Sequence, residues 1–174
     1  PLIAKGQVRG VLEVFHREQH HPESEWESFL QSLAEQAAIA MDNAELFKNL
    51  QRSNEELSLA YDDTITGWAR ALDLREKETA DHSYRVSEIT LLLARTMGVD
   101  ESQLQHIRRG ALLHDIGKVG VSDRILLKPG PLDPEEWKIM KLHTAIGGRI
   151  LSNSDSPVLQ IAEQIALTHH EKWG

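Results

Sequence analysis

The sequence contains no cysteine among its 174 residues, which excludes a disulfide framework and a thiolate metal site. Because this fits a reducing compartment, we expect a cytoplasmic protein. No hydrophobic run approaches the ~18 residues of a membrane span, and the longest lies around residues 89–94. The formal net charge of −8 and the pI of about 5.6 argue against a general DNA- or RNA-binding surface.

Proline is absent from residues 23–75, and Gly67 is the only glycine there. Apolar side chains recur in this segment at intervals of three, four and seven residues, at Phe29, Leu33, Ala37, Ala40, Ala44, Phe47, Leu50, Leu57, Tyr61, Trp68 and Leu72. An unbroken helix of ~54 residues would be ~80 Å long and could not bury this stripe against the chain alone. We therefore expect a parallel coiled-coil homodimer, with Asn54 fixing its register. The alternative is a break near residues 62–63; we expect a dimer stem first and a bundle helix after it.

Before this segment, residues 2–4 and 7–16 are rich in β-forming side chains and meet at Lys5-Gly6, which predicts a β-hairpin. A two-stranded ribbon is marginally stable in water, so we expect sheet neighbours outside this chain. With the following AEQAAIAMDNAELF, the hairpin resembles the C-terminal end of a GAF sensory domain over about residues 1–50.

The second half is organised around residues 110–121, GALLHDIGKVGV. Adjacent His114 and Asp115 offer an imidazole nitrogen and carboxylate oxygens to a metal ion. They follow the apolar residues 111–113. If these belong to a buried helix, both polar side chains lose hydration at a cost in free energy unless they bind something. Gly117 permits close approach of the backbone to a ligand, and Lys118 adds a positive charge.

Further candidate ligands flank this stretch. Glu78 and His82 are four residues apart, so they would project from one face if the segment is helical. A lone histidine is usually solvated or satisfied in a core, but the set as a whole lies near the ends of apolar helical segments. This placement indicates convergence on one bundle core. The candidates are Glu78, His82, His114, Asp115, His143, His169 and His170.

From about residue 64 onwards the sequence resembles the HD superfamily of metal-dependent phosphohydrolases, and within it the HD-GYP subfamily. The resemblance is carried by HDIGKVGV, by ILLKPGPLDPEEWKIMKLHTAIGGRIL and by HHEKW. It implies a mainly α fold in which an HD-type helical bundle follows the long coiled-coil-like helix and the short hairpin from a GAF-type sheet. The expected domains are a GAF remnant (1–50), a helical linker (51–63) and the phosphohydrolase domain (64–174).

The activity implied by the resemblance is hydrolysis of cyclic di-GMP to the linear dinucleotide or GMP, as the output of a bacterial sensor protein. His114, Asp115 and Lys118 would be catalytic, and Lys118 would also bind the substrate phosphate. The seven candidate ligands match the family's metal positions. The family's GYP signature and a further aspartate ligand do not occur before the sequence stops at Gly174. We therefore expect a C-terminally truncated domain that is inactive as this fragment.

The resemblance implies a site with two or three divalent transition-metal ions. Imidazole and carboxylate ligands suit iron, manganese, nickel or zinc alike, and we expect iron or manganese. Asp115 is the candidate bridging ligand between ions about 3.5–4 Å apart, which would activate a water for in-line attack on phosphorus. Two alternatives are an HD nucleotidase acting on a mononucleotide and a non-catalytic metal-binding signalling module. The ILLKPGPL segment and the histidines at 143, 169 and 170 count against the nucleotidase.

Overall fold

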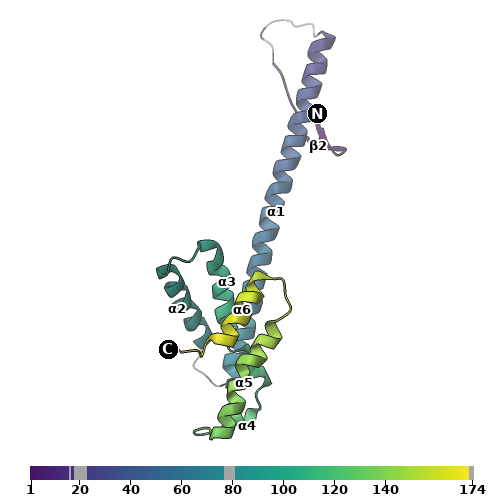
Figure 1. Cartoon of the computed structure of the whole chain (residues 1–174). Helices are drawn as coiled ribbons and strands as arrows, with labels where there is room; N and C mark the ends of the chain where they lie inside the picture. Colours follow the sequence, from purple (N-terminus) through teal and green to yellow (C-terminus); the bar gives the residue numbers. More distant parts are fainter. Residues whose placement is uncertain (16, 18–22, 77–80, 173–174) are drawn as a thin grey trace. The chain divides into compact units, whose positions relative to one another are not determined.

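The computed structural model describes residues 1–15, 17, 23–76 and 81–172 (Figure 1). The chain divides into two compact units, residues 1–59 and 60–174. The prediction of a mainly α fold is confirmed, and no helix of the described residues is long and apolar enough to cross a membrane. The elements are β1 (Leu2–Ala4), β2 (Gln7–Gly10), α1 (Ser24–Glu76), α2 (His82–Thr96), α3 (Glu101–Leu112), the 3₁₀ helix η1 (Ile116–Gly120), α4 (Asp123–Leu126), α5 (Pro134–Leu151) and α6 (Pro157–Thr168).

In the first unit, β1 and β2 form an antiparallel hairpin. Lys5 and Gly6 both have positive φ, 49° and 76°, as a tight two-residue hairpin turn requires. The second strand ends at Gly10, so the prediction of a strand is wrong for residues 11–15, while residue 16 lies outside the described residues. Leu2 already pairs with Gly10, and β1 offers no further residues to the continuing chain. High β-propensity alone does not form a strand without a partner.

The hairpin packs on α1 through small side chains. Leu2 and Ala4 are buried against Ala38, where the small alanine permits close approach of strand and helix. Arg9 and Lys5 both pair with Asp42, whose side chain is only 5% exposed. The buried carboxylate is thus compensated by two cations, which fixes the hairpin on this helix.

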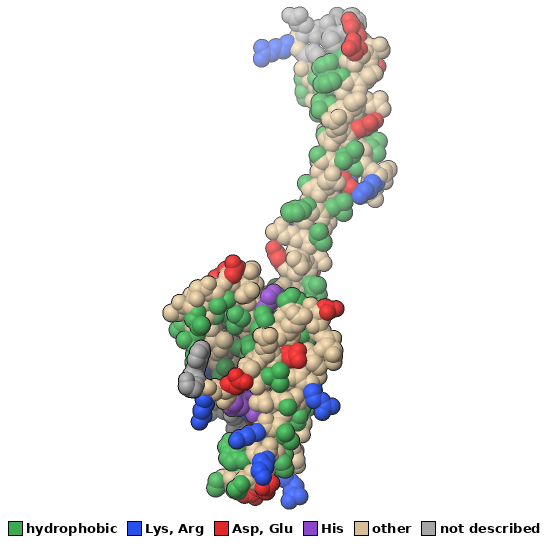
Figure 2. Space-filling view, in the orientation of Figure 1, with side chains coloured by type: hydrophobic (Ala, Val, Ile, Leu, Met, Phe, Trp, Pro, Cys, Tyr) green, Lys and Arg blue, Asp and Glu red, His purple; other side chains and the backbone are tan. Residues whose placement is uncertain are grey.

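Helix α1 is continuous over 53 residues, so the alternative of a break near residues 62–63 is wrong. Nothing in its sequence favours a break, because no proline interrupts it and Gly67 is its only glycine. Figure 2 shows hydrophobic side chains along its surface. In the first unit these include Phe47, Leu50 and Leu57, which are 70%, 69% and 55% exposed.

The second unit is a helical bundle. Helix α3 packs against α2 and α6, and α5 packs against α6 and η1. Leu113, Leu151, Ala162 and Ala166 form the buried core cluster. At Gly110, a Cβ atom would lie 3.2 Å from the α6 backbone at Ala162, so this glycine permits the close approach of α3 and α6.

Local sequence signals set the helix boundaries in this unit. The Asp100 carboxylate accepts a hydrogen bond from the Ser102 amide at the start of α3. Asp133 and Glu136 form a capping box at the start of α5, and Pro157 is the first residue of α6. Gly98, with φ of 76°, follows the end of α2.

Candidate metal centre

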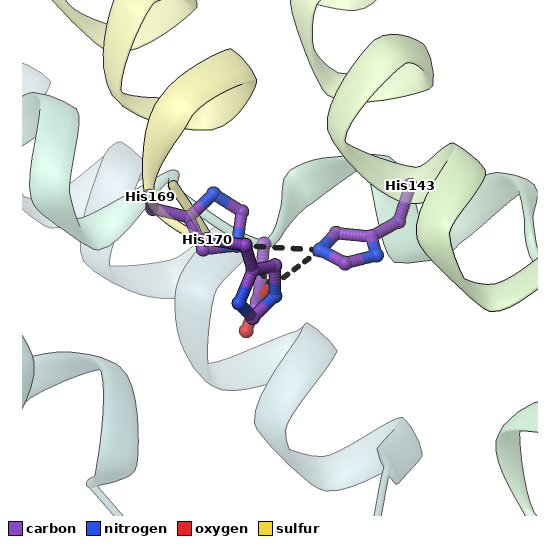
Figure 3. A group of neighbouring side chains, drawn as sticks. His143, His169 and His170 are labelled. Atoms are coloured by element: carbon purple, nitrogen blue, oxygen red, sulfur yellow. Dashed lines mark hydrogen bonds and ion pairs between the residues drawn. The ribbon is translucent and has the colours of Figure 1, made fainter. Parts of the chain in front are cut away.

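The bundle brings six of the predicted ligands together in two groups. One contains Asp115, His143, His169 and His170, and the other contains His82, His114 and Asp115. Within each group the potential ligand atoms lie within 4.8 Å of one another. Figure 3 shows His169 and His170 facing His143 from the neighbouring helix. Asp115 belongs to both groups, so among the described residues it is the carboxylate placed to connect them.

Three parts of the bundle position His114, Asp115, His143 and His169. His114 and Asp115 lie in the turn between α3 and η1, His143 lies within α5, and His169 caps the C-terminus of α6. The turn reaches α5 because Gly117 has no side chain: a Cβ there would lie 1.8 Å from the His143 carbonyl oxygen. The predicted close backbone approach at Gly117 is therefore made to a neighbouring helix, and it brings Asp115 beside His143.

Three of the imidazoles are anchored in the same way. In each, Nδ1 lies within hydrogen-bond distance of the carbonyl oxygen three residues earlier. An Nδ1–H that donates to a carbonyl leaves Nε2 with a free lone pair, which is the tautomer that binds metal. The pairs are His114 with Ala111 at 2.8 Å, His143 with Met140 at 2.6 Å and His169 with Ala166 at 3.0 Å.

The inward-facing nitrogen and oxygen atoms lie so close together that a cation between them would offset their repulsion. The Nε2 atoms of His143 and His169 are 3.2 Å apart, and each lies 3.4 Å from Asp115 Oδ1. With both Nδ1 atoms donating, two nitrogen lone pairs face each other beside a carboxylate oxygen. Asp115 Oδ1 is buried without a hydrogen-bond partner among the described residues. Ligands held at ~2.1 Å from one tetrahedral ion lie about 3.4 Å apart, so these donors fit a metal ion.

The second oxygen of Asp115 faces the other way. Its Oδ2 lies 2.9 Å from His114 Nε2 and 2.9 Å from Lys118 Nζ. The two oxygens of one carboxylate therefore serve the two groups of imidazoles. This is the arrangement that a bridging carboxylate needs, as predicted for Asp115.

Burial and charge place Asp115, His143 and His170 in the protonation states that metal binding requires. Burial lowers the pKa of His143 and of His170. Burial acts to raise the pKa of Asp115, but contacts with His114 and His169 outweigh it and hold that pKa well below its usual value. The pKa of His114 is raised, because its contact with Asp115 outweighs the lowering effect of burial. At neutral pH the site thus holds an ionised carboxylate beside neutral His143 and His170.

Two of the predicted ligands need separate comment. Glu78 lies outside the described residues. His82 is the first residue of α2, and its ring centroid is 5.9 Å from that of His114. The predicted placement of Glu78 and His82 on one helical face involves residues outside the described ranges, and helix α2 itself begins at His82, after Asp81 with φ of 66°. A left-handed residue interrupts an α-helix immediately before His82.

Sequence reasoning missed Glu76, the last residue of α1. Its Oε2 lies 2.6 Å from Lys118 Nζ, and its side chain is 7% exposed. Burial acts to lower the pKa of Lys118, but Glu76 and Asp115 raise it more, so the ammonium stays charged. No local signal marks Glu76, because its partner lies 42 residues further along the chain.

A cavity of about 780 Å³ adjoins the histidines and contains Lys118 and Glu76 in its wall. Helix α5 contributes Trp137, Met140 and Lys141, at the spacing of one helical face. The remaining lining residues are Leu126, Leu132, His143, Thr144, Leu167, His170, Glu171 and Lys172. The cavity therefore combines an apolar wall, several cations and the edge of the histidine cluster, which suits a phosphorylated ligand with an aromatic part.

The helical bundle and its two histidine–aspartate groups are typical of a helical domain that can hold metal ions. The HD domain family matches residues 79–174, and the chain belongs to this family. HD domains are metal-dependent, and the two histidine–aspartate groups supply residues that could hold metal.

Three relatives illustrate what the chain is similar to. A protein of Thermotoga maritima named cyclic di-GMP phosphodiesterase is 48% identical over 128 residues, covering 71% of this chain and 35% of the relative. The 3′3′-cGAMP-specific phosphodiesterase 2 of Vibrio cholerae is 38% identical, covering 78% and 24%. The cyclic di-GMP phosphodiesterase response regulator RpfG of Xanthomonas campestris is 33% identical, covering 84% and 39%. The chain thus spans less than half the length of these relatives.

Proposed function

We propose that this chain is the catalytic part of a cyclic di-GMP phosphodiesterase of the HD-GYP subfamily, yielding the linear dinucleotide or GMP. The observation that carries the proposal is Asp115 placed between two histidine groups at the edge of a cavity that contains Lys118. The 48% identical relative is named for this activity. Two relatives named as 3′3′-cGAMP-specific phosphodiesterases, at 38% and 40% identity, make cyclic GMP-AMP the second candidate substrate.

The metal centre is proposed to hold two or three divalent ions, iron or manganese before nickel or zinc. His143, His169 and His170 would hold metal on one side and His82 and His114 on the other, with Asp115 as the ligand shared between them. Glu78 remains a proposed ligand on the strength of the sequence. When bound, such ions lower the pKa of water and offset negative charge on a phosphoryl group.

The chain's own residues would orient the substrate. Lys118 places an ammonium beside Asp115 in the cavity wall, where it can donate to a phosphate oxygen. Leu126, Leu132 and Leu167 add apolar side chains to the wall of the same cavity. Lys141 and Lys172 add positive charge to the same cavity and suit the second phosphate of a cyclic dinucleotide.

The substrate choice is tested by competition on the metal-loaded, natural full-length protein. Equal concentrations of cyclic di-GMP, 3′3′-cGAMP and a nucleoside monophosphate are offered together, and products are separated by chromatography. Preferential loss of cyclic di-GMP is expected. Preferential loss of 3′3′-cGAMP would favour the second candidate, whereas dephosphorylation of the mononucleotide alone would contradict both.

Trp137→Ala is expected to weaken cyclic di-GMP binding with little change in metal content. Trp137 is 53% exposed and lines the cavity, where its indole can stack on a guanine base. Stacking of a base on an aromatic side chain contributes about 1–3 kcal/mol, so KM should rise at least fivefold. Ile139→Ala is the matched control, because Ile139 lies on the same helix, is 44% exposed and does not line the cavity. Equal effects of the two substitutions on KM would contradict this role.

Residues 1–50 are proposed to be the remnant of a GAF sensory domain, joined by a helical linker (51–63) to the phosphohydrolase domain (64–174). The exposed apolar stripe of α1 supports a parallel coiled-coil homodimer in the first unit. A second copy is the natural occupant because the same stripe on each helix would face its equivalent. A sensory domain at one end of a dimeric helix fits the output role proposed for the bundle.

Phe47→Glu is expected to dissociate this dimer, because a carboxylate in the seam would lose its hydration without gaining a partner. Sedimentation at micromolar concentration measures the effect. Asn49→Glu, also exposed but off the stripe, adds the same charge and should leave the dimer intact. A monomeric unmodified protein would end the proposal, as would a dimer unaffected by Phe47→Glu.

A further inference from the structure

The last two residues of α1, Arg75 and Glu76, both contact the turn that carries Lys118. Arg75 Nη1 donates to the carbonyl oxygens of Lys118 at 3.0 Å and Val119 at 3.2 Å. Its Nη2 donates to the Val121 carbonyl oxygen at 2.9 Å and to the Asp123 carboxylate at 2.7 Å. The last carbonyls of a 3₁₀ helix lack partners within the helix, so one guanidinium satisfies the end of η1 and fixes its backbone.

The neighbouring Glu76 acts on the side chain of the same lysine. Glu76 Oε2 lies 2.6 Å from Lys118 Nζ, and Asp115 Oδ2 lies 2.9 Å from it. The side chains of Lys118 and Glu76 are 14% and 7% exposed, so the contact lies in the wall of the cavity and away from bulk water. Solvent therefore weakens it far less than a surface ion pair.

The contacts with the two carboxylates determine the direction in which the Lys118 ammonium can donate a further hydrogen bond. An ammonium has three N–H donors, and the two carboxylates accept two of them. Because both carboxylates are fixed, the direction of the remaining donor is fixed as well. A lysine on a flexible four-carbon chain would otherwise sample many positions.

We propose that Glu76 is a positioning residue that holds the Lys118 ammonium beside Asp115, with its third donor available to a substrate phosphate in the cavity. Arg75 fixes the backbone of the same turn. The end of α1 therefore determines the position of the Lys118 backbone through Arg75 and the position of its ammonium through Glu76. The inference rests on the proposed function for the role of the phosphate. It does not rest on that function for the fixed position of Lys118.

A double-mutant cycle tests the proposal. Glu76→Ala should lower kcat/KM for cyclic di-GMP by about tenfold, the size expected when a charge-assisted contact is lost, while metal content stays unchanged. In a Lys118→Ala background, Glu76→Ala should have no further effect, because Glu76 acts through Lys118. Glu76→Gln, which keeps an acceptor oxygen, should recover part of the loss.

Asp62→Ala is the matched control, because it removes a part-buried ion pair with Arg109 at 2.8 Å and does not line the cavity. It should leave kcat/KM unchanged. Equal losses from Glu76→Ala with and without Lys118 would overturn the proposal. Loss of metal in Glu76→Ala would overturn it too, since Glu76 would then be a ligand.

Competitive labelling of lysines with an amine reagent, followed by mass spectrometry, separates this proposal from the activity. Lys118 should be labelled several times faster in Glu76→Ala than in the unmodified protein or in Asp62→Ala. Unchanged labelling would overturn the positioning role whatever the substrate. If the unmodified protein did not hydrolyse cyclic di-GMP but Lys118 was still labelled faster in Glu76→Ala, the proposed function would be contradicted and the positioning role supported.

Discussion

Asp115→Ala is expected to abolish cyclic di-GMP hydrolysis and to lower the bound metal in the same step. Asp115 is the single residue common to both histidine groups, and its two oxygens face different imidazoles. Removing it takes an anionic ligand from both groups. It also leaves the Lys118 ammonium paired with Glu76 and no longer with Asp115. Loss of a residue that only hydrogen-bonds to a metal ligand lowers metal affinity by about 10–100-fold. Loss of a ligand shared by both groups should lower the affinity by more.

Elemental analysis and turnover measured on the same sample check this result. His114→Ala should behave similarly but retain more metal, because His114 belongs to only one group. Asp155→Ala removes an exposed carboxylate from the same unit and should change neither quantity. Undiminished metal in both Asp115→Ala and His114→Ala would show that neither is a ligand.

Gly117→Ala is expected to damage the fold and the metal site together. The added Cβ would lie 1.8 Å from the His143 carbonyl oxygen and 2.4 Å from the Gly147 nitrogen. Both are backbone atoms of α5, so no side chain can rotate to relieve the contact. The turn must therefore move away from α5, which separates Asp115 from His143. Overpacking of this severity should cost on the order of 3 kcal/mol in the free energy of unfolding.

Denaturant unfolding and metal content measure the two effects of Gly117→Ala. Gly67→Ala is the control, because a Cβ at this helical position meets nothing within 4 Å. It should raise the free energy of unfolding by about 1 kcal/mol, since alanine favours helix over glycine. A Gly117→Ala protein with unchanged stability and full metal content would contradict the packing of η1 on α5.

Features governed by local chemistry could be predicted from the sequence. Asp100, Asp133 and Pro157 mark helix starts because the groups that they satisfy lie within the next turn. The convergence of His114 and His169 was indicated by histidines near the ends of apolar helices, whereas His143 lies in the middle of α5 and not near an end as expected. Their common Nδ1 anchor also follows from helical geometry, because the carbonyl three residues earlier lies beneath each ring.

Features that depend on residues distant in sequence, or on one residue's backbone conformation, could not be predicted. Glu76 is one acidic residue among several in its segment, and only the fold brings it to Lys118. The end of β2 at Gly10 depends on the length of its partner strand, which propensity does not encode. Helix α2 begins at His82 after the left-handed Asp81, a backbone conformation that the spacing of the candidate ligands does not encode.

Metal content and cyclic di-GMP hydrolysis, measured together on the natural full-length protein, test the proposed metal centre most directly. The purified protein should contain two or three transition-metal ions per chain and hydrolyse the substrate. Chelation should remove the ions and the activity together, and readdition of iron or manganese should restore both. Hydrolysis that continues unchanged after the metal has been removed would contradict the central role given to Asp115 and the histidines around it.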